Sequence, residues 1–107
     1  MANPPALSPE QRAAALEKAA EARRVRAEIK DRLKMGLLTF SELLDEADGN
    51  EIVGKMKVLA ALESMPRLGK VKARRLMEEV GIAESRRLRG LGDSQRRQLL
   101  DHFDTAG

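Results

Sequence analysis

The sequence predicts an all-α protein, in which a long N-terminal helix precedes a compact helical domain. Apolar residues recur at helical spacing, two capping boxes mark helix starts, and no segment alternates apolar and polar residues as a strand does. A chain of 107 residues is long enough for one small domain. We therefore expect an N-terminal extension with a long basic helix (1–36) and a helical domain (37–107), built around one core.

The first helix is expected to begin after Ser8 and to end at Gly36. Ser8 and Gln11 form a capping box, and Pro9 suits the first helical position. Leu16 is the only large apolar residue of the alanine-rich first half. The second half carries a narrow apolar stripe: Val25, Ile29 and Leu33. Because the first half offers so little apolar surface, we expect it to project from the core or to be partly disordered.

Two shorter helices are expected next. Thr39 and Glu42 form the second capping box, at the start of an acidic helix that ends at residues 49–50. Leu38 and Leu43 flank this start as a hydrophobic staple. A weaker third helix begins near residue 52, is broken by Gly54, and resumes with an apolar face: Val58, Leu59, Leu62 and Met65.

The last two helices are separated by an arginine-rich turn. One helix, about 70–80, places four apolar residues on a buried face: Ala73, Leu76, Met77 and Val80. Gly81 is its C-terminal stop. The other helix is capped by Asp93 or Ser94 and returns three apolar residues to the core: Leu99, Leu100 and Phe103.

A basic hairpin (residues 65–70) connects the third and fourth helices. Pro66 and Gly69 mark a tight turn, and Lys70 and Lys72 open the next helix. Unpaired N–H groups, the helix dipole and the two ammonium groups favour an anion at this point. A plain helix connection explains such a hairpin alone about as well. Residues 55–75, however, carry seven basic and one acidic side chain, and this local excess favours contact with a nucleic-acid backbone.

The arginine turn (residues 85–92, SRRLRGLG) is a second basic segment. Gly90 and Gly92 bracket it, and Leu88 and Leu91 are placed to anchor it. We expect this anchoring to hold its three guanidinium groups near the hairpin: Arg86, Arg87 and Arg89. Arginine side chains on such a turn can clamp phosphates or enter a minor groove. A solvated charged turn is the alternative interpretation.

The segments EQRAAALEKAA, GKMKV, LGKVKA and RRLRGLG together resemble the actinobacterial integration host factors over nearly the whole chain. The order of helix, hairpin, helix and arginine turn is also similar to the helix-two-turns-helix unit of a small-subunit ribosomal protein and of formamidopyrimidine glycosylases. The resemblance implies a nucleoid-associated protein that binds double-stranded DNA with little sequence preference and bends or compacts it. It also implies a host factor for phage integration, with phage integrase as a partner on DNA, and no relation in fold to the β-armed integration host factor of enterobacteria.

This resemblance places DNA-binding residues on the hairpin and the arginine turn: Pro66, Arg67, Leu68, Gly69, Lys70, Arg86, Arg87 and Arg89. Lys72 and Arg74, basic residues of the helix that follows the hairpin, are also expected to bind DNA. Arg67 departs from the pattern, since such hairpins often carry glycine there, although its guanidinium could itself reach a phosphate. Auxiliary contacts are expected from six further basic residues: Arg23, Arg24, Arg26, Lys30, Lys55 and Lys57. For the four on the first helix, a solvated face is an equal alternative, because Glu28 and Asp31 interleave with them.

The residue types argue against catalysis. Helix-hairpin-helix glycosylases need a lysine and an aspartate at positions that hold Val71 and Arg89 here, and a phosphate-binding Walker loop needs serine or threonine at Val71. The chain has one histidine and no cysteine, and its acidic segment 42–51 lacks the calcium-binding pattern. We expect no enzyme activity, metal, cofactor or small-molecule substrate, and an acidic segment that is solvated or repels DNA.

Two other classes of function remain open from the sequence. One is an RNA-binding or ribosome-associated protein, although Phe40 and Phe103 are its only aromatic residues and both suit a core better than base stacking. The other is a protein-interaction module built on the alanine-rich helix. No signal peptide or membrane-spanning segment is evident, so we expect a protein of the cytoplasm, associated with the nucleoid. We expect a monomer, because the apolar stripes suffice for one small core and leave no sustained heptad seam.

Overall fold

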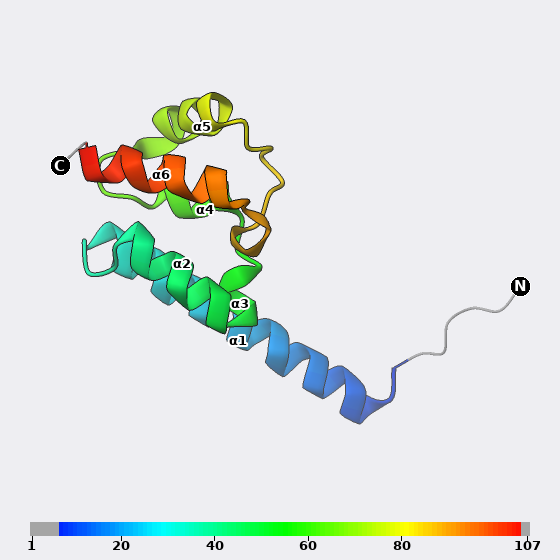
Figure 1. Ribbon diagram of the computed structural model, residues 1–107. Helices are drawn as coiled ribbons and strands as arrows, with labels where there is room; N and C mark the ends of the chain where they lie inside the picture. The colour runs from blue at the N-terminus through cyan, green and yellow to red at the C-terminus, as the bar shows by residue number, and fades with distance from the viewer. Residues whose placement is uncertain (1–6, 106–107) are drawn as a thin grey trace, which may run out of the picture.

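The computed structural model describes residues 7–105 of the chain, and these residues form helices joined by short turns (Figure 1). The elements, in chain order, are α1 (Pro9–Lys34), α2 (Phe40–Gly49), α3 (Glu51–Gly54), α4 (Val58–Glu63), α5 (Gly69–Val80), the 3-10 helix η1 (Leu88–Gly90) and α6 (Asp93–Thr105). Residues 7–105 contain no strand, and one isolated antiparallel bridge joins Lys57 and Arg87. The predicted all-α class, a long N-terminal helix followed by a compact helical unit, is confirmed.

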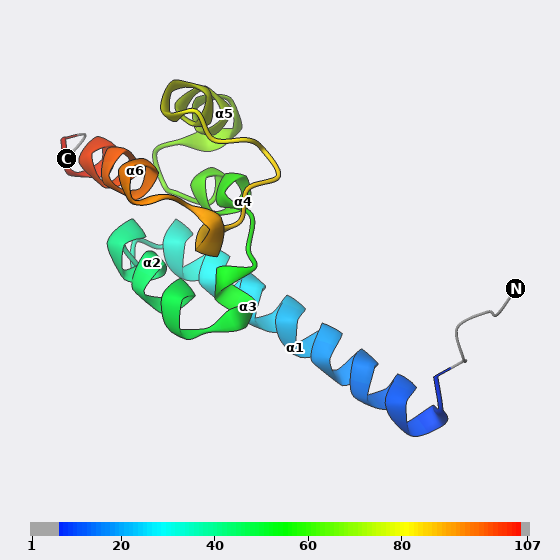
Figure 2. The same ribbon diagram turned by 45° about the vertical axis from the view of Figure 1, so that its right-hand side comes forward.

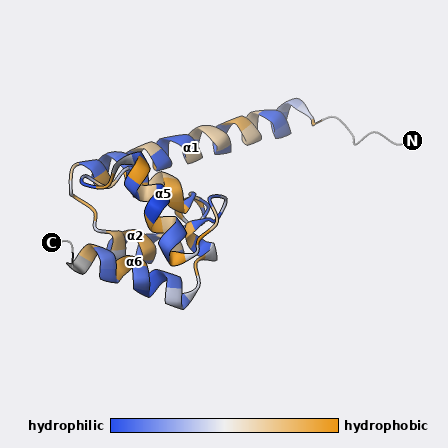
Figure 3. Ribbon diagram, turned by 90° about the horizontal axis from the view of Figure 1, so that it is seen from above, coloured by the Kyte–Doolittle hydropathy of each residue, from blue (hydrophilic) through white to orange (hydrophobic). Residues whose placement is uncertain are grey.

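The second half of α1 packs along α3, with Arg32 paired to Glu46 of α2, and the first half projects away from the rest of the chain (Figures 1 and 2). Ile29 and Leu33 are buried, whereas Leu16 is 63% exposed. Seen from above in Figure 3, the projecting half mixes hydrophilic and hydrophobic residues and has no neighbouring helix to cover it. The prediction that this half projects is confirmed, and so is the capping box that starts it, in which Ser8 and Gln11 exchange two hydrogen bonds.

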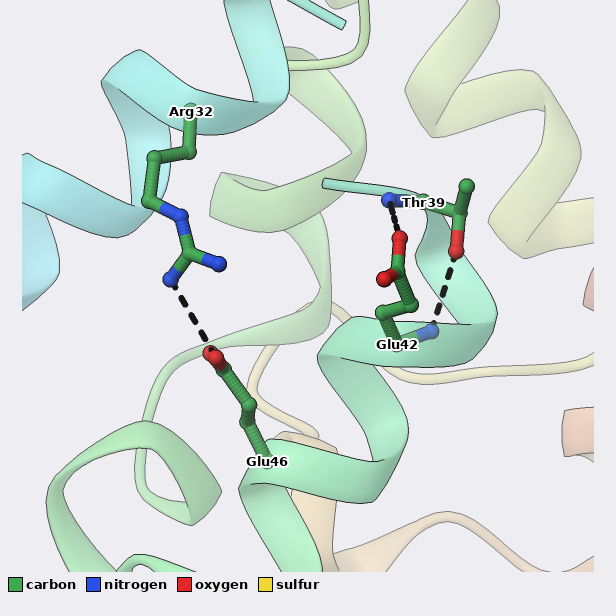
Figure 4. A network of polar contacts seen from close by, with 4 residues as sticks. All are labelled: Arg32, Thr39, Glu42 and Glu46. Carbon is green, nitrogen blue, oxygen red and sulfur yellow. Dashed lines mark hydrogen bonds and ion pairs between the residues drawn. The ribbon is translucent and has the colours of Figure 1, made fainter. Parts of the chain in front are cut away.

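Helix α2 begins with the predicted capping box. The Thr39 hydroxyl accepts a hydrogen bond from the Glu42 N–H at 3.1 Å, and the Glu42 carboxylate accepts one from the Thr39 N–H at 3.0 Å (Figure 4). Leu38 and Leu43, the predicted staple, are both buried. Asn50 then ends α2 and caps α3, since its side-chain oxygen accepts hydrogen bonds from the first N–H groups of α3.

Gly54 separates α3 from α4, as the sequence predicts, and the structure supplies a packing reason. A Cβ atom at this position would lie 2.9 Å from the carbonyl oxygen of Ala47 and 3.3 Å from Cβ of Arg89. Only glycine therefore allows α3 to approach α2 and the arginine turn this closely. The junction that follows, residues 55–57, carries two of the basic side chains discussed below.

Helix α6 closes the core. Phe103 packs against Phe40 of α2 with a ring-centroid separation of 5.1 Å, and Leu99 is fully buried. Arg96 holds Asp48 of α2 through two hydrogen bonds of 2.7 and 3.0 Å. The predicted cap of α6 is wrong: the helix already includes Asp93 and Ser94.

The residue at the cap position of α6 is Gly92. Its carbonyl accepts the first helical hydrogen bond from the Arg96 N–H, and its own N–H donates to the side chain of Gln95. With Gly92 at the cap position, the helix starts one residue earlier than a cap at Asp93 predicts and two residues earlier than a cap at Ser94 predicts. Within residues 7–105, no helix combines the length and the apolar character needed to cross a membrane.

Candidate nucleic-acid interface

The hairpin leads into α5, and the start of this helix is suited to binding an anion. Gly69 adopts a left-handed conformation with φ of 74°, which glycine accepts without strain. No side chain among the described residues caps α5, so the N–H groups of its first turn lack an intrahelical acceptor. Lys70 and Lys72 are exposed beside them. The uncapped N–H groups, the positive end of the helix dipole and the two ammonium groups all favour a bound anion at the start of α5.

Helix α5 separates an apolar face from a basic face, as predicted. Ala73, Leu76 and Met77 are buried in the core, and Val80 is half-buried. The basic side chains point to solvent: Lys70, Lys72, Arg74 and Arg75. Arg74 lies 3.7 Å from the carboxylate of Glu84, an exposed pair that leaves the guanidinium accessible.

An open groove of about 530 Å³ lies between the hairpin and the end of α6. Residues of the hairpin, of α5 and of the end of α6 line it, among them Arg67, Lys72, Arg75, His102 and Phe103. Arg67 is exposed and lines this groove, and a contact of its guanidinium with phosphate stays a prediction.

The arginine turn is docked on the junction between α3 and α4. The Val58 N–H donates to the carbonyl of Arg86, and the Leu88 N–H donates to the carbonyl of Met56, both at 2.9 Å. Leu88 is fully buried and Leu91 is 7% exposed, so both predicted anchors are confirmed. The turn is thereby held in place by backbone hydrogen bonds and by two leucine side chains.

The expectation that this turn lies near the hairpin is wrong. Arg86 is hydrogen-bonded to Val58, the first residue of α4, whereas the hairpin follows Glu63, the last residue of α4. Figures 1 and 2 show the same arrangement: η1 lies beside α3, and the hairpin lies toward the C-terminal end of α6. The reason is that α5 runs back along α4, so the turn that follows α5 reaches the opposite end of α4.

Two predicted auxiliary residues meet the arginine turn directly. Arg87 donates a hydrogen bond of 2.7 Å to the carbonyl of Lys55, and the isolated bridge joins Arg87 to Lys57. We call the resulting group of side chains the basic cluster: Lys55, Lys57, Arg86, Arg87 and Arg89. All five are exposed. No pattern within one segment predicts that these residues lie together, because the lysines and the arginines come from different parts of the chain. Lys55 and Arg87 are 32 positions apart and meet only in the folded protein.

Glu51, part of the predicted acidic segment 42–51, lies beside the basic cluster. This contact was not predicted, although the i,i+4 spacing of Glu51 and Lys55 is a local signal for it. Its carboxylate is 2.8 Å from the Lys55 ammonium. The pKa of the Glu51 carboxyl lies below its ordinary value, because Lys55 donates a hydrogen bond to it and because Lys55, Arg89 and Lys18 are positively charged. The Glu51 side chain is 71% exposed, which agrees with the expected solvated acidic segment, but its pairing with Lys55 was not expected.

The four predicted auxiliary residues of α1 do not form a common site. Arg23 and Arg24 are exposed, Arg26 and Lys30 are half-buried, and none of the four forms an ion pair with another described residue. Arg32, by contrast, pairs with Glu46 of α2 at 3.2 Å (Figure 4). Arg32 therefore has a structural partner, while the four predicted auxiliary residues keep their charges available.

Comparison with known proteins agrees with this geometry. Residues 33–103 match the family of S13-like H2TH domains. The chain is 59% identical over 102 residues to the integration host factor of Mycobacterium tuberculosis, an alignment that covers 95% of this chain and 97% of that protein. It is 55% identical over 107 residues to the integration host factor of Streptomyces coelicolor, covering 100% of this chain and 99% of the relative.

A solved structure is similar as well. The structure of sIHF bound to an 8-bp palindromic DNA matches with a TM-score of 0.79 and 52% sequence identity, and the match covers 81% of this chain and 98% of that chain. The fold and the matched domain thus define a helical protein of the S13-like H2TH class. Within that class, the chain belongs to the integration host factor family of Mycobacterium and Streptomyces.

Proposed function

We propose that this protein is an architectural protein of the bacterial nucleoid, which binds double-stranded DNA with little sequence preference. The observation that carries the proposal is the basic cluster, in which five exposed cations are held on two hydrogen-bonded segments. The relatives named integration host factor and the DNA-bound structure of sIHF support the same function. Cations at defined positions on a rigid surface match the phosphates of a duplex.

The cluster and the hairpin contribute separately in this proposal. Arg86, Arg87 and Arg89 grip the DNA backbone or line a minor groove, with Lys55 and Lys57 beside them. The start of α5, with its free N–H groups, Lys70 and Lys72, offers a second phosphate contact at the other end of α4. Pro66, Arg67, Leu68 and Gly69 shape this contact, and Arg74 extends it along the helix. Such contacts carry little base information, which accounts for the low sequence preference.

Several finer assignments belong to the same proposal. The protein bends or compacts DNA in the nucleoid, acts as a host factor with phage integrase on DNA, and is a monomer without catalytic activity. The absence of catalysis is supported by residue type, since Val71 and Arg89 stand where related glycosylases place reactive side chains. The four available cations of α1 are auxiliary contacts: Arg23, Arg24, Arg26 and Lys30.

An RNA-binding or ribosomal role is less well supported. Phe40 and Phe103 are the only aromatic residues of the chain, and they pack against each other with ring centroids 5.1 Å apart. Phe40 is only 2% exposed. Proteins that hold single-stranded nucleic acid stack bases on exposed aromatic rings, so a duplex backbone is the better ligand.

The decisive experiment is equilibrium binding to a mixed-sequence DNA duplex, its single strand and the corresponding RNA duplex at several salt concentrations. We expect the DNA duplex to bind best, with a slope of log affinity against log salt of roughly −5 if about five or six phosphates are engaged. A flat salt dependence would contradict phosphate binding. A preference for the RNA duplex would move the function to RNA.

The site is tested in the same assay with the triple variant Arg86→Ala, Arg87→Ala and Arg89→Ala. This variant should lose most of the affinity, and about equally for unrelated DNA sequences. The matched control removes three exposed cations elsewhere: Arg12→Ala, Lys34→Ala and Arg97→Ala. Equal losses in the two triple variants would show that net charge, and not the cluster, determines binding. Loss at one sequence only would refute the low-specificity mechanism.

A further inference from the structure

Glu51 is an anion placed among the cations of the basic cluster. Its carboxylate lies 2.8 Å from the Lys55 ammonium. The charges of Arg89 in η1 and Lys18 in α1 also favour the ionised form of this carboxylate, more weakly than Lys55 does. A DNA phosphate that approaches this surface therefore meets a Lys55 ammonium that is already paired with the Glu51 carboxylate.

The fold does not require this carboxylate. The side chains of Glu51 and Lys55 are 71% and 46% exposed, and ion pairs this open to water contribute little to stability. Nor is Glu51 needed to cap α3, because Asn50 already accepts hydrogen bonds from the N–H groups of Ile52 and Val53. The position of Glu51 is therefore better explained by its effect on the neighbouring cations.

We propose that Glu51 competes with DNA phosphate for Lys55 and so limits the affinity of the basic cluster for DNA. This inference rests on the proposed function. Arg87 holds the backbone of Lys55 in place through the carbonyl oxygen, so only the Lys55 side chain must change partner when DNA binds. The exchange replaces one carboxylate contact by one phosphate contact and leaves Glu51 as a like charge beside the duplex.

The proposal predicts that removing the charge of Glu51 strengthens DNA binding. Glu51→Gln keeps the size of the side chain and removes its charge, and should bind a mixed-sequence duplex about two- to fivefold more tightly at low salt, the range expected from releasing an exposed ion pair. The slope of log affinity against log salt should change by less than about 0.9, because Lys55 engages a phosphate in both proteins. Thermal unfolding should be almost unchanged.

The control is Glu46→Gln, which makes the same charge change and also releases a cation from an exposed pair, Arg32 at 3.2 Å. If both variants tighten binding equally, the effect is one of net charge and the inference is wrong. If Glu51→Gln weakens binding, Glu51 orients Lys55 toward DNA, which is the opposite of the proposal.

A double-mutant cycle tests whether the effect of Glu51→Gln on DNA affinity acts through Lys55. In a Lys55→Gln background, Glu51→Gln should lose at least half of its effect on affinity, because the cation that it releases is gone. An undiminished effect overturns the role of Lys55. Failure of the proposed function is recognised separately, since the unaltered protein would then not bind duplex DNA at all.

Discussion

Arg87 donates a hydrogen bond from Nη1 to the carbonyl oxygen of Lys55 at 2.7 Å, although the two residues are 32 positions apart in the chain. The bridge between Lys57 and Arg87 lies beside this bond. Arg86 differs, because its guanidinium donates to the carbonyl of Gly90 within the turn itself, at 3.2 Å. Arg87 therefore has two tasks: it holds the arginine turn on the α3–α4 junction and adds charge to the basic cluster.

Arg87→Ala should destabilise the protein as well as weaken DNA binding. The lost hydrogen bond from a charged donor joins two distant segments, and we expect a loss of about 1 kcal/mol in the free energy of unfolding. Arg86→Ala should cost less stability, because its bond stays within the turn. Urea denaturation of both variants measures the difference, and equal stability of the two would contradict a holding role for Arg87.

Gly54→Ala should damage both the fold and the site. The new Cβ would lie 2.9 Å from the backbone oxygen of Ala47, which cannot move cheaply, and 3.3 Å from Cβ of Arg89. Crowding of this kind typically costs about 1–3 kcal/mol. Displacement of Arg89 should also weaken DNA binding. Thermal unfolding and DNA titration of the variant check the two effects.

Gly49→Ala is the matched control for this substitution. A Cβ at Gly49 meets no atom within 4 Å, and its φ is not in the left-handed region. Alanine favours a helix by about 1 kcal/mol over glycine, so this variant should be as stable as the unaltered protein or more stable. If Gly54→Ala behaves in the same way, the close approach at Gly54 is not a constraint.

The pair of Asp48 and Arg96 should make stability depend on pH. The pKa of the Asp48 carboxyl lies below its ordinary value, chiefly because Arg96 donates hydrogen bonds to it. A carboxyl with a lowered pKa in the folded state stabilises the fold above its unfolded pKa, and this contribution is lost as the pH falls through the folded pKa.

Asp48→Asn should therefore lower the melting temperature at pH 7, and the difference from the unaltered protein should shrink below about pH 4, where aspartate begins to protonate in the unfolded chain. Melting curves across this range provide the measurement. A difference that stays constant with pH would mean that the pair acts through packing and not through charge.

The projecting half of α1 should be dispensable for folding. We propose that residues 23–107 fold without the preceding segment, because Leu16 is 63% exposed while Ile29 and Leu33 remain in the truncated chain. The melting temperature should change little when residues 1–22 are deleted. Ile29→Ala should cost about 2–5 kcal/mol as a buried large-to-small change, and it serves as the positive control. A large loss on truncation would assign a folding role to the projecting half.

Most of the helices of this protein could be predicted from the sequence, because the interactions that start and stop them are local. Ser8 with Gln11 and Thr39 with Glu42 cap helices over three positions, and both capping boxes form as predicted. The faces of α5 follow from helical periodicity, which separates its lysine and arginine side chains from Ala73 and its buried neighbours.

The N-terminal cap of α6 could not be predicted from the preferences of single residues. Asp93 and Ser94 are better caps than glycine in isolation, yet Gly92 takes the position because Gln95 accepts its N–H.

The basic charges and their helices were determined by the sequence itself, since charge and helical periodicity are properties of neighbouring residues. Only the tertiary structure decided which cations share a surface. The return of α5 along α4 carries the arginine turn away from the hairpin and onto residues 55–57, where Arg87 meets Lys55 and Glu51 enters the basic cluster. The approach of Arg87 and Arg89 to residues 51–57 depends on how whole helices pack, so no pattern within a single segment could reveal it, whereas the Glu51–Lys55 pair itself has the local i,i+4 spacing.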